Sequence, residues 1–216
     1  MKNLTEEISS KIALSLSKSK DKTSEEFAVL KYGVFVVIQT SLSVILTALF
    51  GIITNTFIPI VTISIIGSLM KRYSGGAHCT SPNRCLITGI ILSYLFSLIG
   101  ENIINLQFKV SYIIILALLI HSFVILYKKC PVGSINKPLK RKETRIRLRK
   151  KAFFIYSVCA VLFILSIVLK QSRIYINLKY IVIFMILGLY MQVLSLTFMG
   201  NKFILFIDKV LLRINI

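Results

Sequence analysis

The sequence has few acidic residues, few cysteines and no apolar core near its start. Only eight Asp and Glu residues stand against 27 Lys and Arg, which gives a net charge of +19. The four cysteines contain no Cys-x-x-Cys pair and no regular spacing, which argues against a disulfide framework. The first 31 residues carry charges throughout, so we expect no cleavable signal peptide and predict that the first membrane helix directs insertion.

Apolar residues, by contrast, are abundant. They make up 56% of the 216 residues, and the mean hydropathy is +0.80. Water-soluble domains rarely carry so much apolar content. The positive charge alone would suggest a protein that binds nucleic acid. The apolar runs, however, are too long for a soluble nucleic-acid-binding module. The composition therefore indicates an integral membrane protein that meets an anionic lipid surface and has no nucleic-acid partner.

Six apolar segments predict an all-α, polytopic membrane protein with about six transmembrane helices. A spanning helix needs about 20 apolar residues, and the second and third segments have only 14 residues each. We therefore expect the cytoplasmic loop between these two short helices to be drawn into the membrane interface. The segments are Val34–Ile53, Phe57–Met70, Leu86–Ile99, Val110–Tyr127, Ala152–Leu169 and Tyr180–Phe198.

The whole chain, residues 1–216, is predicted to form a single membrane domain. A charged N-terminal segment, residues 1–33, precedes six spans at 34–198, and a C-terminal segment follows at 199–216. With both termini in the cytoplasm, the cytoplasmic segments hold 23 of the 27 Lys and Arg residues. This distribution is a strong positive-inside bias, so we expect a multi-pass protein with cytoplasmic N- and C-termini.

Both terminal segments are predicted to contain helices. Apolar residues recur every four positions from Leu4 to Leu16, with lysines nearby, which is typical of a basic amphipathic helix on the inner leaflet. An ordinary soluble helix is the alternative. The C-terminal residues 201–216 predict a second interfacial helix.

The loop between the two short segments reads RYSGGAHCTSPNRC, residues 72–85, and holds one of the two histidines and two of the four cysteines. Gly75 and Gly76 are expected to end the preceding helix, because glycine adopts backbone conformations closed to other residues. Ser81, followed by proline, predicts the N-cap of the next helix. Cys85 would then lie in the first turn of that helix.

This placement suits nucleophilic catalysis by a cysteine. A helix N-terminus favours the thiolate form of Cys85, and a protonated imidazole nearby favours that form further. His78 precedes the cysteine by seven residues, so a loop folded back over the helix start would bring the imidazole to the sulfur. The pattern predicts a catalytic pair in which His78 is the general base and Cys85 the nucleophile.

Structural and metal-binding roles are the alternatives. A lone cysteine in an apolar helix is more often a packing residue, which we expect of the two cysteines outside the loop. His78, Cys79 and Cys85 could together bind zinc, although no fourth ligand is evident, so we predict neither a metal nor a cofactor. His121 lies inside the fourth apolar segment and is expected to make a structural hydrogen bond or an interface contact. The rival function is a non-enzymatic small transporter, or a sensor with a metal-binding loop.

The loop resembles that of the accessory gene regulator protein B (AgrB) family, the membrane cysteine endopeptidases of bacterial peptide quorum sensing. Beyond the loop, CPVGSINKPLKRK and MQVLSLTFM are similar to the family's Asn-Lys-Pro segment and to its Gln- and Thr-containing last helix. The resemblance covers nearly the whole chain. In the loop it rests on Arg72, Gly75, Gly76, His78 and Cys85.

The resemblance implies a protease that cleaves the C-terminal tail of a short quorum-sensing propeptide and promotes its cyclisation to a thiolactone or lactone. Cys85 would form an acyl-enzyme thioester, and His78 would act first as base and then as acid. The resemblance also implies an AgrD-like propeptide partner with an acidic tail, a homodimer, and the bacterial cytoplasmic membrane as the location. The expected substrate-binding residues are Arg72, Gly75, Gly76, Arg84 and Lys137.

Overall fold

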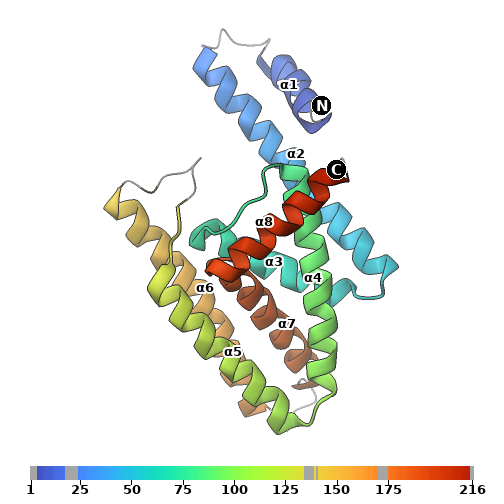
Figure 1. The fold of residues 1–216 in the computed structure, drawn as a ribbon, viewed down its shortest axis with the longest axis vertical. Helices are drawn as coiled ribbons and strands as arrows, with labels where there is room; N and C mark the ends of the chain where they lie inside the picture. The colour runs from blue at the N-terminus through green and yellow to red at the C-terminus, as the bar shows by residue number, and fades with distance from the viewer. Residues whose placement is uncertain (1–3, 18–23, 134–138, 140, 170–174, 215–216) are drawn as a thin grey trace. The chain divides into compact units, whose positions relative to one another are not determined.

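The computed structural model describes residues 4–17, 24–133, 139, 141–169 and 175–214, and these residues form an all-α fold (Figure 1). They divide into two units, Met1–Leu49 and Phe50–Ile216, each of which is considered by itself. The described helices are α1 (Leu4–Ser17), α2 (Ser24–Ile53), α3 (Phe57–Ser74), α4 (Pro82–Asn105), α5 (Phe108–Lys129), α6 (Lys142–Val168), α7 (Tyr175–Leu194) and α8 (Phe198–Arg213).

The first unit consists of α1 and most of α2. The helix predicted near the N-terminus is confirmed, and its apolar residues Ile8 and Ile12 are about two-fifths exposed, at 39% and 40%. Helix α2 is 30 residues long, with two glutamates in its first turn, where the positive end of the helix dipole favours them. It is long and apolar enough to cross a membrane.

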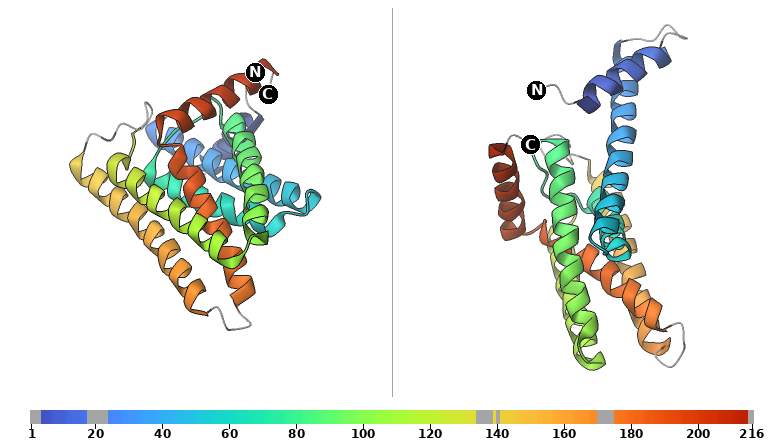
Figure 2. Two further views of the ribbon diagram at one scale, coloured as in Figure 1. Left: turned by 60° about the horizontal axis from the view of Figure 1, so that its bottom comes forward. Right: turned by 90° about the vertical axis from the view of Figure 1, so that its right-hand side faces the viewer.

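Helix α7 is the central helix of the second unit and contacts α3, α4, α5 and α6 (Figures 1 and 2). A helix that is apolar on all sides suits either a protein interior or a lipid environment. Helix α7 lies in the interior, where the surrounding helices bury its apolar side chains. Its core side chains are at most 3% exposed: Val182, Ile183, Phe184, Ile186, Leu187, Leu189 and Val193.

The outward faces of the surrounding helices are also apolar. An aqueous surface would make so many exposed large hydrophobic side chains an aggregation hazard, whereas lipid tails solvate them favourably. The polytopic membrane architecture is thus confirmed by the surface as well as by helix length. Side chains of the second unit that are more than half exposed include Ile58, Ile113, Ile120, Phe154, Val161, Ile164 and Val168.

The number and lengths of the spans differ from the prediction of six. Among the described helices, four are long and apolar enough to cross a membrane: α2, α4, α5 and α6. The third apolar segment is not short, because it lies inside the 24-residue α4. Helix α3 is extended to 18 residues only by a polar end that carries Lys71 and Arg72, and it is not among the candidate spans.

The last apolar segment is divided between α7 and α8. These helices are bent by 88° relative to each other and together form a possible fifth span, either broken or re-entrant. Thr197 caps α8, because its hydroxyl accepts a hydrogen bond from the Gly200 N–H at 3.0 Å. The predicted C-terminal helix is therefore confirmed, and it returns toward the start of α4 (Figure 1).

Candidate functional site

The loop between α3 and α4 has the backbone that its sequence predicts. Helix α3 ends at Ser74, and Gly75 and Gly76 follow with positive φ angles of 72° and 120°. Helix α4 begins at Pro82, with Ser81 as an extended N-cap that makes no side-chain capping bond in the described residues. The Cys85 N–H donates to the Ser81 carbonyl at 3.0 Å. Cys85 therefore lies in the first turn of α4, as expected.

Three side chains meet the Cys85 sulfur. The side chains of His78 and Cys79 both lie close enough to the sulfur to interact with it. The Lys71 ammonium, from the last turn of α3, lies 3.6 Å from Sγ. The loop does bring the imidazole to the sulfur, and a positive charge and a helix N-terminus reach it as well. Each of these groups stabilises a thiolate more than a neutral thiol.

Cys79 lies beside Cys85. Its sulfur is 3.5 Å from the Thr88 hydroxyl and also hydrogen-bonds with Cys85. The bond with Cys85, and then burial, raise the pKa of the Cys79 thiol above its usual value. Cys79 therefore keeps its proton and donates to Cys85, which leaves Cys85 as the sulfur that carries negative charge.

We expect Lys71→Met to move the pH midpoint of Cys85 alkylation by iodoacetamide upward by about one unit, the effect of one lost charge in partly buried surroundings. Lys71→Arg should leave the midpoint near that of the wild type, because it keeps the charge. The measurement is labelling across a pH series, followed by peptide mass spectrometry, in a Cys79→Ala background. Equal midpoints for the Met and Arg variants would show that the ammonium does not stabilise the thiolate.

The start of the loop is held by backbone contacts from distant parts of the chain. Val132, between α5 and α6, donates its N–H to the Ser74 carbonyl at 2.8 Å and forms a parallel bridge with Gly75. The buried Gln192 of α7 donates to the Gly75 carbonyl at 2.8 Å. A Cβ on Gly76 would lie 2.6 Å from the Ser195 hydroxyl. These contacts give both glycines a packing role, and their contact with substrate stays a prediction.

We expect Gly75→Ala to destabilise the protein by about 2 kcal/mol, because alanine is strained at a positive φ and its Cβ would lie 1.9 Å from the Val132 carbonyl oxygen. In detergent this should lower the Tm by about 4–8 °C. Gly89→Ala is the matched control, since a Cβ at Gly89 meets no described atom within 4 Å. Similar melting of the two variants would contradict the steric role of Gly75.

The three predicted basic substrate-binding residues have different surroundings. Arg72 is exposed, with its guanidinium 5.9 Å from the Tyr73 ring centre. Arg84 is half-buried and forms a salt bridge at 2.8 Å with Asp208 of α8. Lys137 lies outside the described residues. Their binding of substrate stays a prediction, and Arg84 has a structural partner that the sequence did not suggest.

The remaining histidine and cysteines lie away from the loop. His121 Nδ1 is 3.1 Å from the Tyr190 hydroxyl, which agrees with the expected structural hydrogen bond. Cys130 and Cys159 are 5% and 1% exposed, as packing residues should be, and burial raises the pKa of Cys130 to about 11. The described residues contain no group of three or more His, Cys, Asp or Glu side chains that could hold a metal ion.

Sequence reasoning missed three residues that support the loop: Lys71, Gln192 and Asp208. Lys71 lies one helical turn before the glycine pair, and a lysine side chain at that position is long enough to reach the start of the next helix. Gln192 and Asp208 are polar residues on the buried, otherwise apolar faces of their helices, a pattern that commonly marks function in membrane proteins. Their contacts with the loop, however, join positions more than 100 residues apart.

Comparison with known proteins places the chain among sequences of one family. The profile described as "Accessory gene regulator B" matches residues 9–196. A "Putative AgrB-like protein" of Clostridium perfringens strain SM101 is 28% identical over 211 residues, with 97% of each chain covered. The "Accessory gene regulator protein B" of Staphylococcus aureus strain Newman is 25% identical over 156 residues, 72% of this chain and 78% of its own. No solved structure shows a significant match. The chain therefore belongs to the accessory gene regulator B family.

Proposed function

We propose that this protein is a membrane cysteine endopeptidase that removes the C-terminal tail of a short quorum-sensing propeptide. The observation that carries the proposal is the Cys85 sulfur, placed at a helix N-terminus with the His78 imidazole close by and the Lys71 ammonium at 3.6 Å. Membership of the accessory gene regulator B family supports it. These two observations are of different kinds, because the first concerns the geometry of the site and the second concerns sequence similarity.

The reaction begins when the Cys85 thiolate, whose proton His78 holds, attacks the carbonyl carbon of the scissile bond. A carbon–sulfur bond forms, and the carbonyl oxygen becomes an oxyanion, which backbone N–H groups at the start of α4 can stabilise. Collapse of this intermediate breaks the carbon–nitrogen bond. The departing amine takes the proton back from His78, and the peptide remains on Cys85 as a thioester.

Release of the thioester produces the ring. A thiol or hydroxyl within the bound peptide attacks the thioester carbonyl, its proton passes to His78, and the bond to Cys85 breaks. The product is a thiolactone or a lactone, and the enzyme returns to its starting state. A thioester keeps the energy of the cleaved peptide bond available for this ring closure, whereas direct hydrolysis would lose it.

Basic residues near the site suit a substrate with an acidic tail. Lys142, Arg145 and Arg149 line a pocket of about 460 Å³ together with Cys130, Pro131 and Ile146. The guanidinium of Arg149 is held there by a 2.9 Å bond to the Tyr127 carbonyl. We propose that this pocket and the exposed Arg72 attract the tail electrostatically from the cytoplasmic side. The proposal includes anionic lipids around the protein and a homodimer as the working form.

The test is co-expression with candidate propeptides from small open reading frames beside the gene, followed by mass spectrometry of the peptides. Cells that carry the propeptide alone are the control. A product that lacks its C-terminal tail, and is lighter by one further water when cyclised, supports the proposal. Intact propeptide beside well-expressed protein would refute it, and the zinc content of the purified protein would then test the metal-binding alternative.

A further inference from the structure

Helix α8 buries a single carboxylate on an otherwise apolar face. Asp208 is 4% exposed, and the neighbouring positions on that face, Ile204 and Leu211, are also buried. A buried carboxylate is costly unless charge and hydrogen bonds compensate it. An amphipathic helix that served only as a membrane anchor would not need one there. The contacts of Asp208 must therefore compensate the cost of burying its carboxylate.

Those contacts join α8 to the catalytic loop at two places. Asp208 Oδ2 accepts from the Thr80 N–H at 3.1 Å and from the Thr80 hydroxyl at 2.9 Å. Asp208 Oδ1 accepts from Arg84 Nε at 2.8 Å. Arg84 also donates to the Thr80 hydroxyl at 2.7 Å, which closes a ring of hydrogen bonds. Both carboxylate oxygens are thus satisfied within the described residues.

The two anchored residues, Thr80 and Arg84, lie between His78 and Cys85 in the loop. Thr80 lies two residues after His78, and Arg84 lies immediately before Cys85. A carboxylate that binds both residues limits the separation of the imidazole from the sulfur. Buried ion pairs are weak evidence for stability, because apolar replacements are often as stable. We therefore interpret the Asp208 contacts by their effect on the geometry of the loop.

We propose that Asp208 is a positioning residue, which from α8 fixes the loop between His78 and Cys85 in its reactive geometry. This inference rests on the proposed function, since it assigns Asp208 a part in the same reaction. The family profile ends at residue 196, so α8 and Asp208 lie beyond the matched region. The carboxylate acts through Thr80 and Arg84 and does not touch the reacting atoms.

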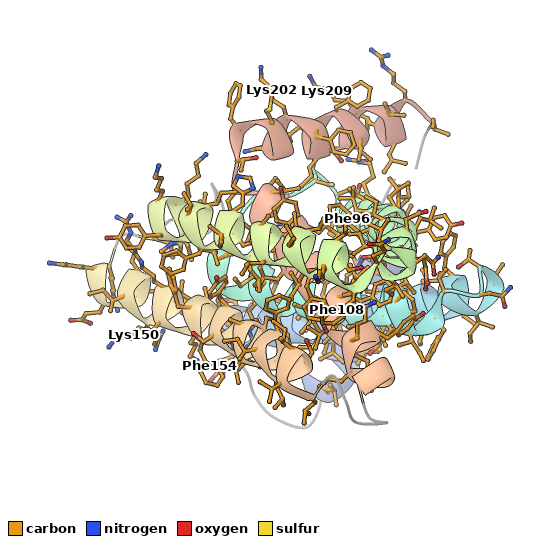
Figure 3. The ribbon with its side chains drawn as sticks, turned by 90° about the horizontal axis from the view of Figure 1, so that it is seen from below. Phe96, Phe108, Lys150, Phe154, Lys202 and Lys209 are labelled. Carbon is orange, nitrogen blue, oxygen red and sulfur yellow. The ribbon has the colours of Figure 1, made fainter. Side chains whose placement is uncertain are left out.

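The first test is Asp208→Asn, which keeps the side-chain shape but loses the charge and one acceptor oxygen. We expect kcat for propeptide cleavage to fall about 10- to 100-fold with KM nearly unchanged, because misplacement of a reacting group by about 1 Å has this effect. Lys209→Gln is the matched control, since Lys209 is exposed and projects from α8 away from the other helices of its unit (Figure 3). Equal kcat in both variants would overturn the proposal.

A second readout does not require the propeptide. In a Cys79→Ala background, alkylation of Cys85 by iodoacetamide is followed from pH 5 to pH 10. Asp208→Asn should shift the midpoint of the rate profile, because the contact of His78 with the sulfur is loosened, while Lys209→Gln should not. An unchanged profile in Asp208→Asn overturns the inference. A shifted profile in an Asp208→Asn protein that melts like the wild type upholds it, whereas failure of the wild-type protein to cleave any propeptide refutes the proposed function separately.

A double variant separates positioning from substrate binding by Arg84. If Arg84 acts with Asp208 as one unit, Asp208→Asn combined with Arg84→Gln should cleave no more slowly than the worse single variant. The alternative is that Arg84 holds the substrate tail independently. In that case Arg84→Gln raises KM, the two losses multiply, and the carboxylate's role in positioning through Arg84 is contradicted.

Discussion

Cys85→Ala should lower propeptide cleavage by about 1,000-fold or more while leaving the protein in the membrane at its normal level. The reason is that no other group can form the thioester. Cys79 is the nearest sulfur, but it keeps its proton and lies in the loop, not in the first turn of α4. Cys85→Ser should retain little activity, because an alkoxide is far harder to generate than a thiolate.

Cys79→Ala is the matched control for this prediction. It removes a thiol that contacts the same site, so it should reduce the rate only modestly, through the lost hydrogen bond to Cys85. Mass spectrometry of peptides from wild-type, Cys85→Ala and Cys79→Ala cells gives the comparison directly. A trapped peptide adduct on Cys85 in the Cys79→Ala protein would identify the nucleophile. Normal cleavage by Cys85→Ala would falsify the mechanism.

His78→Gln is expected to have the second-largest effect, a loss of about 10²- to 10⁴-fold in kcat, the usual contribution of a general acid–base group. Glutamine can keep a hydrogen bond to the sulfur but cannot carry a proton between thiol, leaving amine and attacking group. The measurement is initial rate of tail release in membranes with a synthetic propeptide, at saturating concentration.

His121→Gln is the control that the chain itself offers. It removes the other histidine, which bonds to Tyr190 at 3.1 Å away from the loop, so cleavage should stay near the wild-type rate. Alkylation of Cys85 should fall less than cleavage in His78→Gln, because the Lys71 ammonium and the helix N-terminus remain. If both histidine variants cleave at the same rate, His78 is not the general base.

Local sequence was sufficient to place the loop between α3 and α4. Gly75 and Gly76 end α3 because their positive φ angles exclude other residues, and Ser81 with the proline after it begins α4. These are short-range rules, and they put Cys85 in the first turn without any knowledge of tertiary structure. The all-α membrane class followed in the same way from composition.

Long-range contacts and span boundaries could not be read from the sequence. The Asp208 carboxylate reaches Thr80 across 128 positions, and Gln192 reaches Gly75 across 117. No periodicity in one helix reports a partner at that separation. The span boundaries were misplaced because hydropathy stops at polar residues, whereas α4 continues through Asn102 to Asn105 and α7 ends at a bend of 88°.

The contact between α8 and the loop has a practical consequence for topology mapping. Asp208 and Thr80 share hydrogen bonds, so the end of the chain and the reaction centre must face the same compartment. A single reporter enzyme fused after the last residue therefore registers the sidedness of proteolysis itself. With the expected cytoplasmic C-terminus, alkaline phosphatase fused at this position should be inactive, because it is active only outside the cytoplasm. Green fluorescent protein fused at the same position should fluoresce.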